Sequence, residues 1–427
     1  MFDVTATWNQ ACRSIAGSAT LYLGVRISPQ PRAARTPVYG VVLLDLSRSM
    51  EGAKLAATRQ AVQTLWQQLR DGDWLSIVTF STTSAVLLPW TEKRHRDSTH
   101  IAAAVAGCRA SGTTNLRPGL DEAVRLAAQA PKEAGRFIWL LTDGDPTDSE
   151  GKRISDLQPF LNSASEAAAA GVTMCAIGLG NAEHYRAEFL RELSDQGRGS
   201  FCYAATLDQL SAQLQQQLAG AHEVVMPSAS LSLDLEPGNQ LLAAARVVPT
   251  YVPLDIPPAK GHWSLALGNL TLPETVLLLE VATAAPLMAE VGTRTVGMLR
   301  IRAERGGPSW ETSSPLALRF ERPGSPDILN RDSLIEGLRY SMLLVRNEAL
   351  RLRARTTEEK LRATEIMIDM VQKTGDTVVR DKLQAEGEQL RQNQDLTCDQ
   401  EASMMQDIRA TSRLVYRRQT ERDGGPL

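Results

Sequence analysis

The chain has 427 residues, with 46 Lys and Arg against 49 Asp and Glu, which gives a formal net charge of −3 at pH 7. This length exceeds one ordinary hydrophobic core and predicts two or three domains. The balanced charge lacks the basic excess typical of nucleic-acid-binding proteins, and a hydrophobic content of 43% excludes an intrinsically disordered chain. No apolar stretch is long enough to cross a membrane, and the first residues lack a signal-peptide pattern. The five scattered cysteines contain no C-x-x-C pair, so we expect a cytoplasmic protein without structural zinc.

Residues 1–35 contain a clear strand pattern. Leu21, Leu23 and Val25 fall on one face of an extended chain, while Tyr22 and Arg26 fall on the other. A single strand must pair with others to be stable. We therefore predict that residues 1–35 supply strands to a β-sandwich formed mainly by a later part of the chain.

Residues 36–222 alternate between strand and helix signals. Buried strands are predicted at 38–44, 74–80, 137–141, 172–177 and 201–203, an edge strand at 85–88, and helices at 54–69 and 207–218 among others. Repeated β-α units indicate an α/β domain with a doubly wound, mainly parallel sheet covered by helices on both faces.

Residues 223–325 change to short alternating runs separated by Gly- and Pro-containing turns. Leu231, Leu233 and Leu235 alternate with Ser232 and Asp234, and similar runs follow at 263–267, 276–281, 298–303 and 316–320. This pattern predicts a β-sandwich. Because residues 1–35 share it, the α/β domain is predicted to be inserted between strands of the sandwich.

Residues 326–427 are predicted to be helical and to form a small bundle docked on the rest. An amphipathic helix begins near Leu334, and a second one opens at the capping box Thr356-x-x-Glu359 and ends at Gly375. A third helix is predicted over 400–418. The apolar spacing is too irregular for a sustained coiled coil.

Three separated segments carry oxygen donors in a pattern that suits a divalent cation. Asp45-x-Ser47-x-Ser49 directly follows the first buried strand, Thr114 lies in a Ser-Gly-Thr-Thr-Asn segment, and Asp143 follows another buried strand. Carboxylates and hydroxyls are hard ligands, which favour Mg²⁺ over zinc or copper. Ligands of parallel sheets gather beyond the carboxyl ends of the strands, so the Asp45 and Asp143 loops are predicted to share one rim.

In this order, the three segments resemble the metal-ion-dependent adhesion site of the von Willebrand factor A domain family, over about residues 37–220. Asp45, Ser47, Ser49, Thr114 and Asp143 match its five metal-site positions one for one. The resemblance implies bound Mg²⁺, with Mn²⁺ or Ca²⁺ as alternatives, and a metal that holds an Asp or Glu of a protein partner without performing chemistry. Thr114 is preferred to Thr113 because Thr-Asn-Leu followed by Gly119 matches the family pattern. Arg48 stands where the family often has Gly and adds a cation beside the site.

The sandwich and the helical tail resemble bacterial intracellular A-domain proteins, including those encoded near AAA+ ATPases or kinase–phosphatase signalling genes. This resemblance implies an adaptor role with such proteins as partners, while the balanced charge and the short apolar stretches argue against nucleic acid and a membrane span. The chain itself contains no G-x-x-x-x-G-K-[ST] phosphate-binding motif.

Several alternatives remain open from the residues. Asp-x-Ser-x-Ser is also a helix-capping pattern. A metal-assisted phosphatase or esterase would use Asp45 or Ser47, but it would need an activating base. A metal-free structural subunit is the third possibility. Asp145 and Asp148 are interpreted as solvated turn residues, and Asn115 as a brace of its loop.

Overall fold

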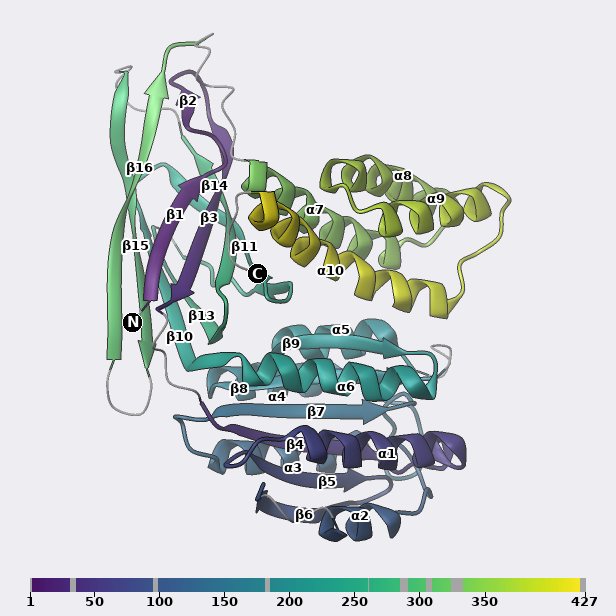
Figure 1. Ribbon diagram of the computed structural model, residues 1–427. Coiled ribbons are helices and arrows are strands. Elements are labelled where there is room, and N and C mark those ends of the chain that lie inside the picture. The colour runs from purple at the N-terminus through teal and green to yellow at the C-terminus, as the bar shows by residue number, and fades with distance from the viewer. Residues whose placement is uncertain are drawn as a thin grey trace.

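A computed structural model describes residues 2–30, 36–94, 99–180, 185–259, 261–284, 291–304, 309–323 and 333–422. The chain forms three parts: an α/β domain, a β-sandwich and a group of C-terminal helices (Figure 1). The sandwich and the helices lie side by side above the α/β domain in this view. None of the described helices is both long enough and apolar enough to cross a membrane.

The α/β domain is built on a six-stranded sheet with the order β6-β5-β4-β7-β8-β9. All neighbouring pairs are parallel except β5 with β6, which is antiparallel and lies at the edge. The strands are β4 (Val38–Asp45), β5 (Trp74–Phe80), β6 (Ser84–Glu92), β7 (Gly135–Thr142), β8 (Val172–Leu179) and β9 (Arg198–Ala204). The central strands β4 and β7 are buried almost throughout, as expected for strands covered on both faces.

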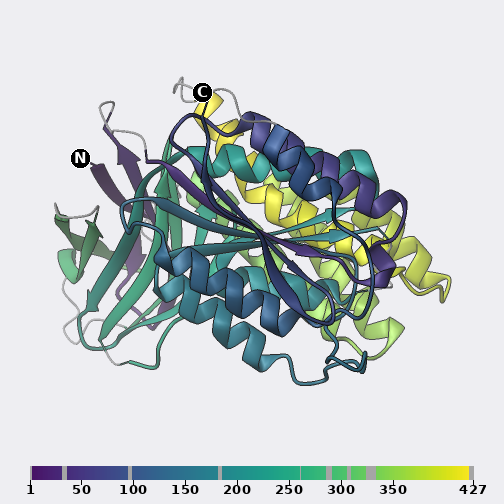
Figure 2. The same cartoon turned by 90° about the horizontal axis from the view of Figure 1, so that it is seen from below.

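Helices cover both faces of this sheet (Figure 2). One hydrophobic core contains side chains of α1 (Ala53–Gln68), α2 (Thr99–Ala106) and α6 (Leu207–His222). The other contains side chains of α3 (Leu116–Gln129), α4 (Gln158–Ala169) and α5 (Ala187–Gln196). Gly119 lets α3 approach the sheet closely, because a Cβ at this position would lie 2.7 Å from Cβ of Phe80. The predicted doubly wound α/β fold is confirmed.

The sandwich consists of two five-stranded sheets, ordered β1-β3-β14-β11-β12 and β13-β10-β15-β16-β2. The amino-terminal segment provides β1 (Phe2–Trp8), β2 (Cys12–Ser14) and β3 (Ala19–Pro29). The rest are β10 (Val224–Leu235), β11 (Asn239–Val248), β12 (Val252–Leu254), β13 (His262–Thr271), β14 (Thr275–Thr283), β15 (Gly292–Glu304) and β16 (Ser309–Glu321). β3 precedes the α/β domain in the chain and pairs with β14, which follows it. The α/β domain is therefore inserted between strands of the sandwich, and this prediction is confirmed.

Four C-terminal helices follow: α7 (Ser333–Arg353), α8 (Thr357–Thr374), α9 (Thr377–Arg391) and α10 (Cys398–Arg422). The capping box of α8 is present, with Thr356 and Glu359 bonded reciprocally, and Gly375 ends the helix at φ 73°. The sequence analysis predicted three helices and missed α9. Its buried residues recur at helical spacing, but two of them, Glu386 and Gly387, do not carry apolar side chains, so the apolar pattern in the sequence is interrupted.

The helices dock on both other parts. Ala402 and Met405 of α10 join the core on the α5 side of the sheet, while Val415 and Tyr416 pack with Val248 in a cluster on the sandwich. The predicted domain boundary at 222/223 falls between the end of α6 and the start of β10. The boundaries predicted at 35/36 and 325/326 fall on or next to residues 31–35 and 324–332, which lie outside the described residues.

Candidate metal centre

The candidate site is built where two neighbouring parallel strands end. β4 and β7 pair in register with Leu44 opposite Leu141, so their carboxyl ends lie side by side. Asp45 is the last residue of β4, and Asp143 directly follows the last residue of β7, Thr142. Both carboxylates therefore reach the same rim of the sheet, and both residues are 0% exposed.

A continuous set of hydrogen bonds joins four of the five predicted ligands. Asp45 accepts from the backbone amide of Ser47 at 2.7 Å and, through its other oxygen, from the Thr142 hydroxyl at 2.6 Å. The hydroxyl oxygens of Ser47 and Ser49 lie 3.0 Å apart. The Ser49 hydroxyl donates to Asp143 at 2.7 Å. The two loops thus place two carboxylates and two hydroxyls in one small volume.

The serines do not cap a helix. The short 3-10 turn Arg48–Met50 has Ser47 at its N-cap position, and α1 has Gly52, and neither makes a side-chain capping hydrogen bond. The capping alternative is therefore wrong, because the hydroxyls of Ser47 and Ser49 face each other and Asp143.

The third loop is tied to the first by its backbone. Ser111 N donates to Leu46 O at 2.7 Å, and Arg48 N donates to Gly112 O at 3.2 Å. The Thr114 hydroxyl faces the Asp143 loop, because a Cβ at Gly144 would lie 3.1 Å from its oxygen. The Thr113 hydroxyl instead lies 3.4 Å from the Thr82 hydroxyl.

Of the two threonines, Thr114 is thus the one whose hydroxyl lies beside the loop that carries Asp143. Among the described residues, no hydrogen bond joins the Thr114 side chain to the other four predicted ligands. The structure places it beside the set without linking it directly.

Lys54 is a member of the site that the sequence analysis missed. Its ammonium group lies 2.5 Å from Oδ2 of Asp143, and its side chain is 27% exposed. Lys54 belongs to the first turn of α1. The sequence around it does not indicate that its side chain points toward Asp143. Thr142, which donates to Asp45, was also missed because it ends an otherwise apolar run.

The two buried carboxylates of the site would be stabilised by a nearby positive charge. Burial raises the pKa of Asp45 to about 6, although the hydrogen bonds from Thr142 and Ser47 favour its charged form, and the charge of Asp143 raises it further. Among the described residues, the one ion pair made by either carboxylate joins Asp143 to the ammonium group of Lys54, and no cation pairs with Asp45. A divalent cation would supply the charge that this arrangement lacks.

The geometry fits a small hard cation. Neighbouring ligands of Mg²⁺, each at about 2.1 Å, lie about 3.0 Å apart on an octahedron. The 3.0 Å between the Ser47 and Ser49 hydroxyls is compatible with this spacing, and it is also an ordinary hydrogen-bond distance. The described residues contain no group of three or more His, Cys, Asp or Glu side chains that could hold a metal. A cation here would depend on hydroxyl ligands and water in addition to the two carboxylates.

One neighbouring residue differs from its interpretation, and two agree with theirs. Asp145 is buried, not solvated: it accepts from the Arg186 amide at 2.6 Å and lies 3.6 Å from Arg153. Asp148 does form a turn, in which it accepts from the amides of Glu150 and Lys152. Asn115 braces its loop as expected, although its partner is the distant carbonyl of Thr82.

The fold and the site together define a class of protein. Residues 41–217 match the family model of the von Willebrand factor type A domain, and the chain contains a domain of this family. Its additional strands and C-terminal helices accompany that domain in a solved structure, described as a von Willebrand factor type A protein from Catenulispora acidiphila. This structure superposes with a TM-score of 0.74 over 90% of this chain and 89% of the other, at 16% identity.

Sequence relatives extend from bacteria to mammals. An uncharacterized protein of Synechocystis, sll0103, is 25% identical over 76% of this chain and 78% of its own length. The inter-alpha-trypsin inhibitor heavy chain H1 of Sus scrofa is 27% identical over 48% of this chain, and the match spans only 22% of that protein. The resemblance of the α/β domain to the A-domain family is confirmed by these comparisons.

Proposed function

We propose that the protein is an adaptor that binds a partner protein through a divalent cation held by Asp45, Ser47, Ser49, Thr114 and Asp143. The observation that supports it most directly is the convergence of two buried carboxylates with two serine hydroxyls that cap no helix. Mg²⁺ is the proposed ion, with Mn²⁺ and Ca²⁺ as alternatives.

The ligand set supports recognition of an acid. Two carboxylates and neutral hydroxyls leave a divalent ion with unfilled positions, which a Glu or Asp of another protein can occupy. Ser49 and Arg48 are exposed at the rim, so a partner can reach the ion, and the guanidinium of Arg48 adds attraction for an acidic surface.

The partner class and the location belong to the same proposal. An AAA+ ATPase or a component of a kinase–phosphatase system is the proposed partner, in keeping with the adaptor role. None of the five cysteines forms a disulfide in the part of the chain that the structure describes, and four of them are buried, which supports a reducing compartment such as the cytoplasm.

Calorimetric titration with Mg²⁺ and Mn²⁺ tests the site. We expect the wild type to bind one ion, and the double variant Ser47→Ala/Ser49→Ala to lose at least about tenfold in affinity, since two neutral ligands are removed. Circular dichroism and thermal unfolding should show that the variant stays folded, because Ser49 is exposed and neither serine caps a helix. A matched control is Ser200→Ala, which lies on β9 away from the rim.

Partner binding is tested by a pull-down with and without EDTA, with Asp143→Ala as the non-binding variant. Capture of the same protein by wild type and variant, unaffected by EDTA, would contradict metal-dependent recognition.

A second candidate function, a metal-free structural subunit, is favoured by one observation. Lys54 already pairs with Asp143, so the site carries partial charge compensation without an ion. On this alternative, neither Mg²⁺ nor Mn²⁺ produces heat of binding or a thermal shift in the wild type. The same titration therefore separates the two candidates.

A further inference from the structure

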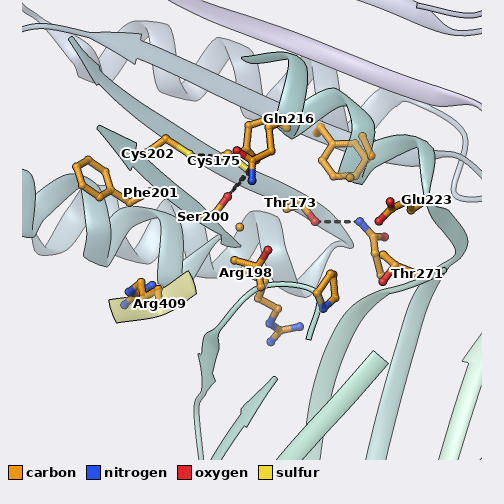
Figure 3. A pocket seen from close by; sticks show the side chains of 18 of the residues that line it. Thr173, Cys175, Arg198, Ser200, Phe201, Cys202, Gln216, Glu223, Thr271 and Arg409 are labelled. Carbon is orange, nitrogen blue, oxygen red and sulfur yellow. Dashed lines mark hydrogen bonds between the residues drawn. The ribbon is translucent and has the colours of Figure 1, made fainter. Parts of the chain in front are cut away.

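A cavity of about 180 Å³ lies where the three parts of the molecule meet, and none of the five candidate metal ligands lines it. Its walls come from β8, β9 and α6 of the A domain, from β11 and β13 of the sandwich, and from α10. In Figure 3, Glu223 and Thr271 stand on one side of the space, Ser200 and Arg409 on the other, and Arg198 between them. Gln216 and Glu223 are exposed, so the cavity has an entrance from solvent.

The cavity carries an excess of positive charge. Four arginines line it, namely Arg198, Arg246, Arg409 and Arg413, whereas Glu223 is the single carboxylate among its described lining residues. Arg409 is neutralised by Asp195, which it contacts at 2.5 and 2.7 Å. Among the described residues, the other three make no ion pair with a carboxylate. The fold therefore gathers guanidinium groups around one space: Arg198 and Arg413 have only the more distant charges of Asp255 and Glu223 near them, and Arg246 has no carboxylate as a partner in the described part of the chain.

Arg246 is the most constrained of these groups. It is 7% exposed and donates to the carbonyls of Arg198 at 2.9 Å and Leu267 at 3.5 Å, while its Nε has no hydrogen-bond partner. Burial, together with the charge of Arg198, lowers the pKa of Arg246 to about 10, so it stays protonated at neutral pH. A buried, unpaired guanidinium is costly for a protein and is normally matched by an anion.

Other polar atoms of the wall also lack partners. These are Oγ1 of Thr271, Oδ1 of Asn269 and Oε1 of Gln213, all buried. Buried polar groups are nearly always hydrogen-bonded, so several unpaired ones around a single space indicate that something polar occupies it. A cavity of about 150 Å³ holds a molecule the size of benzene. The present cavity matches an anion between phosphate and a four-carbon acid in size.

The two thiols in the wall do not supply an alternative chemistry. Burial raises the pKa of both Cys175 and Cys202, the latter to about 12, so neither is a thiolate at neutral pH. The cavity is thus suited to binding and not to thiol reactions.

We propose that this cavity binds a small oxyanion, a phosphate or a short carboxylate, through Arg198, Arg246 and Arg413, and that the bound anion joins the A domain to the sandwich and α10. Arg413 is held at the wall by bonds to Pro249 O at 2.8 Å and the Thr250 hydroxyl at 3.3 Å. The proposal is independent of the metal site.

Thermal unfolding of the full chain tests it, in EDTA so that the metal rim is not involved. Inorganic phosphate and malate are the two probes, each compared with chloride at equal ionic strength. We expect at least one of them to raise the melting temperature of the wild type by about 2–4 °C at saturation. Arg246→Met should lose this rise, whereas the control Arg302→Met should keep it, because Arg302 is 58% exposed on β15 outside the cavity.

Arg198→Met provides a second variant if Arg246→Met does not fold, since its guanidinium makes no hydrogen bond among the described residues. It should lose the rise as well. The absence of a rise in the wild type with both probes, as for a cavity filled only by water, would overturn the proposal. An equal rise in the wild type and in the arginine variants would overturn it too.

Discussion

Lys54 gives the A-domain rim a built-in positive charge. Its ammonium group forms an ion pair with Asp143, one of the carboxylates proposed to bind the cation. An arriving divalent ion and Lys54 compete for the same oxygens, and a side chain that is 27% exposed has room to swing away. On the proposed function, Lys54 would therefore lower the affinity of this site for a metal ion.

Lys54→Met should increase the affinity for Mg²⁺ about three- to tenfold, because the ion no longer has to displace a paired ammonium group. Calorimetric titration measures the change. Lys54→Arg retains the charge and should bind no more tightly than the wild type. An unchanged or weaker affinity in Lys54→Met would show that Lys54 does not compete with the metal.

Asp73 ties three elements of the A domain together. Its carboxylate accepts from the amide of Val38 at the start of β4, from the amide of Arg70 after α1, and lies 2.7 Å from Nε2 of His222 at the end of α6. Burial acts to raise the pKa of Asp73, but the hydrogen bonds from His222 and the two amides outweigh it, so the pKa lies below its usual value. The charged carboxylate therefore stabilises the folded state.

Asp73→Asn should reduce the free energy of unfolding by about 1–3 kcal/mol at pH 7, as expected for a buried charged group with several hydrogen bonds. Because the pKa of Asp73 is lowered in the folded state, its charge stabilises the protein at pH values above the ordinary Asp pKa of about 3.9. This stabilisation is lost as the pH falls through the folded-state pKa. The difference between wild type and variant should therefore shrink below about pH 4. Urea unfolding across this range measures it.

Asp121→Asn is the control for Asp73, because Asp121 is 51% exposed and should show little effect at any pH. A cost for Asp73→Asn that stays constant from pH 7 to pH 3.5 would contradict the role of the charge.

The elements that the sequence did not predict share a physical cause. β11 and β12 were missed in the sandwich, and α9 in the helical tail. In β11, Leu241 is buried between exposed neighbours, but Ala243 is half-buried and all residues from Ala244 to Val248 are buried, so the alternation is incomplete. In α9, Glu386 and Gly387 occupy buried positions, so the apolar pattern is interrupted there too.

Helix α10 contacts both the A domain and the sandwich. Gln406 accepts from the amide of Tyr203 on β9, Arg409 pairs with Asp195 on α5, and Ser412 donates to Val247 O on β11. Arg409 and Asp195 are each about 7% exposed, and Arg191 is a second partner of Asp195 at 3.0 Å. This buried group fastens the helical tail to the A domain.

Arg409→Met should lower the free energy of unfolding by about 3 kcal/mol, since it leaves a buried carboxylate with one cation fewer. Adding Asp195→Asn to it should recover part of this loss. Urea unfolding measures both variants, and limited proteolysis shows whether residues 333–422 become accessible first. If Arg409→Met alone is as stable as the wild type, the pair does not hold the tail.

Local patterns were sufficient for the architecture and for most of the rim. The alternation of strands and helices predicted the sheet, and Asp45, Ser47, Ser49 and Asp143 were found because each follows or ends a strand whose apolar run is visible in the chain. Side-chain periodicity is a property of neighbouring residues, so it is readable without coordinates.

Only the tertiary structure showed that Lys54 pairs with Asp143 and that Asp145 is buried. It also showed that one cavity is lined by arginines from three parts of the molecule, namely Arg198, Arg246 and Arg413. These contacts join residues far apart in the chain. They depend on how helices and sheets pack, and no spacing in the sequence records that packing.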